Sequence, residues 1–372
     1  MAKRKNSSIM EGTFSSADEG SSGTESSDYF KLIKHDKIFP TKASDWKMSH
    51  LLDLGIYYDE TATELQTFMS MLKEGIPKPK LMCSDIEIPG IKKKLIQLTK
   101  DWWKFSFDFE SAEKSLTGSG VRESLQQTME AIEVFEEENH SIVESLKKME
   151  QEDWKSLQVY SVWRMNVLEF LRYFSMLLTR WGKPYQGKER FTNLLMAFSK
   201  ICFLYPEPGK TLCEIIQIKD TMVQGSPDIR FLTFPTSTSK KNSELLVVTK
   251  VQQYDAFIGD YAKGETFTFE HLSKIVLGQH GIELLIERES SFFFPAGVVG
   301  LLCIGTKVIF TFLQISQGHY QMIRERGKVD KTNRATISYT KPYDYMSATD
   351  RAEILEALYC LGFIQSNPEQ FS

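Results

Sequence analysis

The chain has 372 residues, of which 41% are hydrophobic and 25% are charged. This composition is ordinary for a globular protein with a buried core, so a fibrous or wholly disordered chain is excluded. Its 45 Lys and Arg residues stand against 49 Asp and Glu residues, which gives a formal net charge of -4. The chain as a whole therefore lacks the basic field that attracts nucleic acid, and any such binding needs a local patch.

The length favours two compact units with a tail, and the residues before position 188 divide into three sections. Residues 1–28 are rich in Ser, Gly, Glu and Asp and are predicted to be a disordered tail. Residues 29–120 form a mixed N-terminal region, in which a section of short amphipathic segments begins at Trp46 and is closed by Pro77 and Pro79. Residues 121–187 are predicted to be helical, because apolar residues recur there mostly every three or four positions.

The second half changes pattern at a polar break over 179–189. We predict an α/β domain over 188–325, in which helices flank a central mixed sheet, and a C-terminal extension over 326–372 that contains a helix. The predicted helices cover 189–203 and 269–288. The runs with strand character cover 214–218, 229–234, 245–251, 298–304 and 308–315.

The compartment is predicted from cysteine usage and from the N-terminal residues. The five cysteines are far apart and form no CxxC pair, which indicates reduced thiols in an intracellular protein. The first residues carry no apolar segment of the length that a secretory signal needs. The basic cluster Lys3 to Lys5 fits either a nuclear localisation element or an ordinary solvated tail, so we expect a cytoplasmic or nuclear protein.

The most apolar stretch, residues 292–306, is interpreted as part of the sheet and not as a membrane span. It is followed by Lys307 and is shorter than the ~20 residues that cross a bilayer. Pro295 and three glycines interrupt it, whereas its Val and Ile content suits two buried strands joined by a turn. No membrane partner is expected.

Three segments of the α/β domain together resemble the PD-(D/E)xK nucleases, the restriction-endonuclease-like superfamily. Ser226-Pro227-Asp228 opens a strand, and about twenty residues later a second strand contains the run LLVVTK that ends at Lys250. Gln279 and Glu283 lie on the helix that follows, and Glu189 begins the first helix, where such families often place another acid. The 45–56 segment is also similar to N-terminal segments of Crinkler-like and mobile-element proteins in which such domains occur.

The resemblance implies Mg²⁺-dependent phosphodiester hydrolysis, with Asp228 and Glu189 as metal ligands. The catalytic set that it implies is Asp228, Lys250, Gln279 and Glu283. Carboxylates suit a hard cation such as Mg²⁺. A lysine two residues beyond an acid lies on the same face of a strand, because strand side chains alternate.

The signature is incomplete, because Val248 stands where the second acid is expected. We therefore interpret the protein as a degenerate pseudo-nuclease that would bind nucleic acid or a protein partner with little or no hydrolysis. Two alternatives remain open. In the first, Glu283 supplies the missing carboxylate to an active DNA endonuclease, and in the second, the protein is a helical interaction scaffold. Each residue alone also fits an ordinary turn, strand end or helix surface, so the argument rests on their order.

A local basic patch would favour DNA or RNA as the partner. The C-terminal half supplies ten basic residues with interleaved tyrosines that could form one. They are Lys240, Lys241, Lys250, Lys307, Arg324, Arg326, Lys328, Lys331, Arg334 and Lys341, with Tyr320, Tyr339 and Tyr343.

Overall fold

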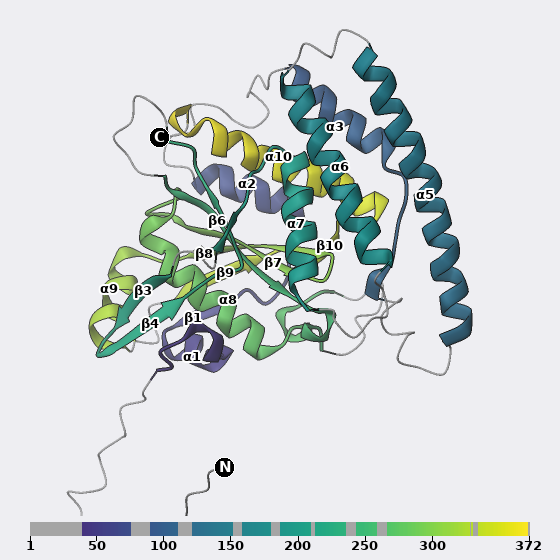
Figure 1. Cartoon of the computed structure of the whole chain (residues 1–372). Coiled ribbons are helices and arrows are strands. Elements are labelled where there is room, and N and C mark those ends of the chain that lie inside the picture. The colour runs from purple at the N-terminus through teal and green to yellow at the C-terminus, as the bar shows by residue number, and fades with distance from the viewer. Residues whose placement is uncertain are drawn as a thin grey trace, which may run out of the picture. The chain divides into compact units, whose positions relative to one another are not determined.

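The computed structural model describes ten stretches of the chain, and Figure 1 shows their arrangement. They are residues 39–75, 90–110, 121–151, 158–179, 187–209, 213–235, 243–258, 266–327, 329 and 334–370. Residues 39–372 cluster as one unit. The predicted disordered tail and the section end at Pro77 and Pro79 lie outside the described residues.

The described residues contain an eight-stranded mixed sheet, so the prediction of an α/β protein is confirmed. Its strand order is β1-β9-β8-β7-β6-β5-β2, and β10 pairs with β8 beside this path. The pairs β6–β7 and β1–β9 are parallel, and the others are antiparallel. The bounds are β1 (Ile56–Tyr58), β2 (Glu207–Pro208), β5 (Ile229–Leu232), β6 (Leu245–Gln252), β7 (Gly297–Ile304), β8 (Lys307–Gln314), β9 (Ala335–Tyr339) and β10 (Tyr343–Asp344).

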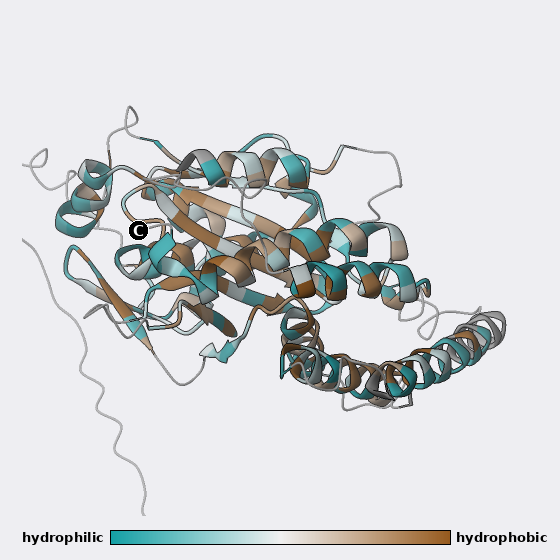
Figure 2. Ribbon diagram, turned by 90° about the horizontal axis from the view of Figure 1, so that it is seen from above, coloured by the Kyte–Doolittle hydropathy of each residue, from teal (hydrophilic) through white to brown (hydrophobic). Residues whose placement is uncertain are grey.

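The centre of the sheet is buried on both faces. Every residue of β7 is buried, and β6 and β8 are buried except at their ends. Strands covered on both sides read as continuous apolar runs, which is why these segments were recognisable in the sequence. The central strands are accordingly brown in Figure 2.

One face of the sheet is covered by helix α8 (Lys274–Ile286). An added Cβ at Gly300 of β7 would meet His280 and Leu284 of this helix. The helix carries two glycines where the N-terminal segment approaches it: a Cβ at Gly278 would lie 2.2 Å from the carbonyl carbon of Lys47. Helix α8 is thus held between the sheet and the segment that contains η1 (Ala43–Asp45) and α1 (Met48–Asp53).

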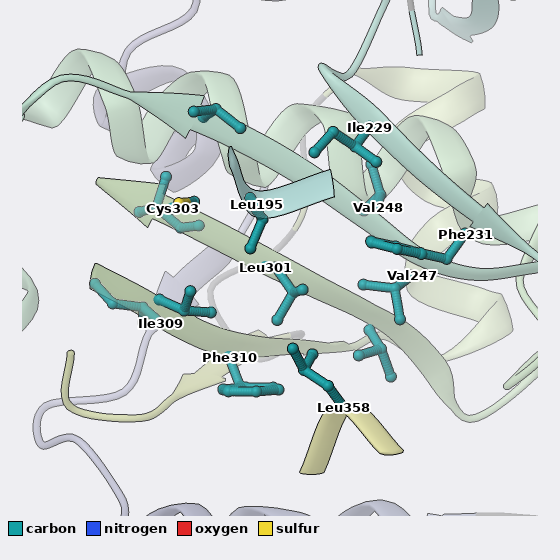
Figure 3. Close-up of a cluster of buried hydrophobic side chains, with 14 of the residues drawn as sticks. Leu195, Ile229, Phe231, Val247, Val248, Leu301, Cys303, Ile309, Phe310 and Leu358 are labelled. Atoms are coloured by element: carbon teal, nitrogen blue, oxygen red, sulfur yellow. The ribbon is translucent and has the colours of Figure 1, made fainter. Parts of the chain in front are cut away.

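The other face packs against α7 (Glu189–Ile201) and α10 (Ala348–Ser366). Figure 3 shows Leu195 of α7 and Leu358 of α10 in one cluster with Val247, Leu301 and Phe310 of the sheet. The remaining helices are α2 (Leu65–Gly75), α3 (Gly90–Trp102), α5 (Val121–Gln151), α6 (Gln158–Thr179) and α9 (Gln317–Arg326). The hairpin of β3 (Glu214–Ile218) and β4 (Thr221–Gly225) forms a separate two-stranded sheet.

The sheet extends beyond the predicted 188–325 segment at both ends of the chain. Strand β1 comes from the N-terminal region and pairs with β9, which comes from the C-terminal extension. The predicted 269–288 helix is shorter than expected: 3-10 turns at Phe269–His271 and Glu287–Ser290 flank α8, and Leu272, between the first turn and the helix, has an extended backbone.

The apolar 292–306 stretch forms β7 and the turn that leads into β8, as the sequence predicted. Gly305 occupies this turn with φ +61°, a conformation that favours glycine. Among the described helices, none combines the length and the apolar composition needed to cross a bilayer.

Candidate functional site

Asp228 lies at the entrance to β5 and is fixed to the neighbouring strand β6. Its backbone N–H donates to the carbonyl of Thr249 at 3.0 Å. Its Oδ2 accepts the backbone N–H of Val251 at 2.9 Å. The carboxylate is therefore held beside Lys250 by the pairing of the two strands.

Lys250 points from β6 towards α8, where it meets Glu283. Its Nζ lies 2.8 Å from Oε1 of Glu283, and both side chains are buried, with exposed fractions of 8% and 2%. Asp228 contributes to the electrostatic field at both groups. Asp228, Lys250 and Glu283 therefore converge between two strands and one helix.

A second lysine, just before α7, contacts Asp228. Lys188, the residue before the helix, places its Nζ 2.7 Å from Oδ1 of Asp228. Its side chain is 33% exposed, whereas that of Asp228 is 5% exposed. We call Lys188, Asp228, Lys250 and Glu283 the charged quartet.

Burial and the neighbouring charges oppose each other at Glu283 and at Lys250. Burial raises the pKa of Glu283 to about 7, and the nearby Lys250 ammonium opposes part of this rise. Burial alone would lower the pKa of Lys250, but the carboxylates of Glu283 and Asp228 outweigh it, so that pKa is raised. Oε2 of Glu283 is buried without a hydrogen-bond partner among the described residues. The quartet therefore has one unused acceptor.

Val248 occupies the position on β6 where the sequence resemblance leads us to expect an acid. It lies two residues before Lys250 on the same strand face and is fully buried. Its strand partner is Arg230, whose side chain pairs with Glu287. The position expected to hold an acid is thus filled by an apolar side chain, and Glu283 reaches Lys250 from α8 instead.

Arg230 and Glu287 form a second buried ion pair that sequence reasoning missed. Arg230 lies two residues after Asp228, and Glu287 four residues after Glu283. Glu214 of β3 lies 3.8 Å from the same guanidinium. The i+2 spacing on a strand and the i+4 spacing on a helix were the signals that could have located this pair.

Gln279 and His280 have other contacts. Gln279 donates from Nε2 to the carbonyl of Ser44 at 2.6 Å, and so holds η1 against α8. His280 is fully buried, with Nε2 2.8 Å from the Thr311 hydroxyl. Burial, helped by the Lys250 charge, lowers the pKa of His280 to about 3, so the ring is neutral at physiological pH.

Glu189 is the exposed first residue of α7. The side chain from this end of the helix that contacts Asp228 is that of the preceding residue, Lys188. The metal-ligand role of Glu189 stays a prediction.

The expected basic patch is weakened by burial and pairing. Lys250 is buried, Lys307 pairs with Glu110 and Lys341 pairs with Glu64. The three tyrosines of the pattern are buried as well, so none offers a free ring for base stacking. Arg324, Arg326 and Arg334 are exposed, while Lys240, Lys241, Lys328 and Lys331 lie outside the described residues.

Two carboxylates are a workable donor set for Mg²⁺, which commonly binds one or two carboxylates and retains several waters. Asp228 and Glu283 share the quartet, and the unused Oε2 of Glu283 gives a cation a vacant donor. Within the described ranges, no group of three or more His, Cys, Asp or Glu side chains is arranged to hold a metal. The described residues therefore offer two carboxylates at most, and Mg²⁺ binding by them stays a prediction.

The chain matches no protein-family model, and comparison with curated proteins and with solved structures gives no significant match either. Inference about function therefore rests on the geometry of these residues.

Proposed function

We propose that the protein is a Mg²⁺-dependent DNA endonuclease of the PD-(D/E)xK type in which Glu283 replaces the acid missing at Val248. The observation that carries this proposal is the meeting of Asp228, Lys250 and Glu283. Asp228 enters from one strand, Lys250 from the next, and Glu283 from the helix that covers both. This set contains the two acids and the lysine that the chemistry needs.

The order of elements supports the proposal. Helix α7 is followed by β5 and β6, then by α8 and the strand pair β7–β8. This is the helix, strands, helix, strands order that the resemblance implies, which supports the proposal. The i, i+4 relation of Gln279 to Glu283 lets one helix both bind the N-terminal segment and supply the carboxylate.

Energetics also favour a functional role for the quartet. A buried ion pair loses hydration of both charges and is often no more stabilising than an apolar pair of similar volume. Lys250 and Glu283 are almost fully buried, and the pKa of Glu283 is strongly raised. Perturbed, buried titratable groups of opposite sign cluster at active sites more often than elsewhere.

Each residue has a distinct role in the proposed reaction. Asp228 and Glu283 would hold the cation, and Lys250 would hold its ammonium beside the phosphate and offset the negative charge that develops there. When bound, Mg²⁺ would polarise the phosphate and make a bound water more acidic.

A non-hydrolytic module that binds nucleic acid or a protein partner is the second candidate. Two observations favour it: Val248 in place of the acid, and the low exposure of Asp228, Lys250 and Glu283. A catalytic group must reach its substrate, and in this arrangement Lys188 must move first to expose Asp228.

Cleavage of supercoiled plasmid and of single-stranded DNA tests the proposal. Wild type is compared, with Mg²⁺ and with EDTA, against D228A, K250A and E283Q. The control E289Q alters an exposed glutamate that pairs with Arg324 just beyond α8. We expect Mg²⁺-dependent cutting by wild type and E289Q that the three site variants lose. No cutting by wild type, or cutting unchanged in E283Q, would reject the hydrolytic proposal in favour of the binding module.

A further inference from the structure

We propose that Lys188 is a displaceable cap, whose ammonium occupies the position on Asp228 that a divalent cation takes, so that cation binding and the Lys188–Asp228 contact exclude each other. This inference rests on the proposed function, because it concerns the same two carboxylates. It adds a regulatory step and assigns a residue outside the nuclease motif.

The first argument is the use of each carboxylate oxygen. Oδ2 of Asp228 is bound by the Val251 N–H, and Oε1 of Glu283 by Lys250. The remaining two are Oδ1 of Asp228, bound by Lys188, and Oε2 of Glu283, buried without a partner among the described residues. A cation that uses both carboxylates without breaking the strand contact or the Lys250 pair must therefore take Oδ1 from Lys188.

The second argument is the difference between the two lysines. The Lys250 side chain is 8% exposed and lies between β6 and α8, so it cannot leave without burying an unpaired Glu283. Lys188 is 33% exposed and lies at the end of α7, with a flexible side chain that can extend into water. Asp228 is only 5% exposed and loses this partner when Lys188 leaves, so the exchange is favourable only when a cation takes the place of the ammonium. Lys188 is the member of the quartet able to exchange with a cation.

The third argument is charge. With both carboxyls ionised, two lysines and two acids make the quartet formally neutral. If a divalent cation replaces the Lys188 ammonium, the group that remains has a formal charge of +1, from two positive charges on the cation, one on Lys250 and two negative charges on the acids. With Lys188 on Asp228, the quartet is formally neutral and has no excess positive charge to attract a phosphate. The exchanged form attracts an anionic substrate.

Titration of the full chain with Mn²⁺, followed by electron paramagnetic resonance of the free ion, tests the exchange. The variant K188M removes the ammonium and keeps an unbranched side chain of similar length, and K188Q is used if K188M does not fold. The control is K200M, because Lys200 on α7 is about as exposed as Lys188 and pairs with Glu169 at 2.9 Å. D228N removes the shared carboxylate.

We expect K188M to bind Mn²⁺ about three- to tenfold more tightly than wild type, the range given by losing a competing ion pair of about 1 kcal/mol together with its charge repulsion. K200M should bind as wild type does, and D228N should lose the site in either background. Binding by K188M alone would also support the cap. Equal or weaker binding by K188M would overturn the cap and leave the metal site intact, whereas absence of binding by both proteins would overturn the metal site and the cap together.

Discussion

Lys250 of β6 and Glu283 of α8 form a buried ion pair, with Nζ and Oε1 2.8 Å apart, that joins the central strand to the helix covering it. Removing one partner leaves the other charge buried and unpaired, and such losses are about 3–5 kcal/mol. We therefore expect K250M and E283L each to lower the free energy of unfolding strongly, and the double variant to lose much less than their sum. Urea denaturation measures this coupling.

The control is the same set of measurements, with two single variants and the double variant, on the exposed pair Arg324–Glu289. Its coupling should be much smaller, because water screens both groups. Strictly additive losses for K250M and E283L would contradict the ion pair as described.

Gly278 of α8 lies against the backbone of the N-terminal segment, which gives a second prediction. A Cβ at this position would lie 2.2 Å from the carbonyl carbon of Lys47, which a backbone cannot accommodate without moving. We expect G278A to lower the free energy of unfolding by about 1–3 kcal/mol and to expose residues 39–58 to protease. The control G318A, on α9, has no atom within 4 Å of the new Cβ and should gain up to about 1 kcal/mol. Equal effects of the two changes would argue against the close packing of this segment on α8.

Arg351 of α10 gives a third prediction, because its guanidinium binds four backbone carbonyls. Nε donates to Tyr345, Nη1 to Trp103, and Nη2 to Phe105 and Met346, at 2.7–2.9 Å. Each buried carbonyl left without a donor costs about 1–3 kcal/mol, so R351M should lose at least 3 kcal/mol. R351K should recover only part of the free energy of unfolding that R351M loses, since a single ammonium cannot donate to four carbonyls as the planar guanidinium does. A chemical denaturation curve for R351K that overlays wild type would contradict this role.

The pH dependence of stability provides a fourth test, at Asp344. Burial raises the pKa of Asp344 to about 6, although hydrogen bonds from Met346 and Thr306 oppose the rise. Because the unfolded value is about 3.9, the folded state binds more protons between pH 4 and 6. The contribution of Asp344 to stability is therefore present at low pH and is lost as pH rises through about 6.

Replacing this carboxyl removes that titration. The free energy of unfolding of D344N, relative to that of wild type, should be higher at pH 7 than at pH 4.5. Urea unfolding of both proteins at the two pH values measures this difference. The variant D255N, which changes an exposed aspartate, should show no such difference. If the free energies of unfolding of wild type and D344N differ by the same amount at both pH values, the pKa of Asp344 is not raised.

The sequence predicted the central part of the fold because buried strands and amphipathic helices leave periodic patterns. Strands β6, β7 and β8 are long apolar runs, and α7 has the expected helical spacing. Strand β1 was missed, since three residues carry too little pattern and its partner β9 is almost 280 residues away in the chain. Pairing between such distant segments is decided by tertiary contacts.

The candidate site was predictable only in part. Asp228, Lys250 and Glu283 could be named because the order of motifs on strand, strand and helix suggested them. Lys188 could not, because a single lysine before a helix has no pattern that distinguishes it from any solvated lysine. Its contact with Asp228 arises because α7 packs against β6, the strand that pairs with β5, and only the three-dimensional arrangement reveals this.

Moving the carboxylate back to the strand tests the central claim most directly. Val248 and Lys250 share one strand face, and Asp is close to Val in volume, so V248D can supply an acid on the face that Glu283 approaches from α8. We would measure Mg²⁺-dependent plasmid cleavage by wild type, E283Q and V248D/E283Q, each first shown to be folded by its thermal transition. We expect cutting by wild type, loss of cutting in E283Q and recovery in V248D/E283Q. Undiminished cutting by folded E283Q would show that Glu283 does not supply the missing acid.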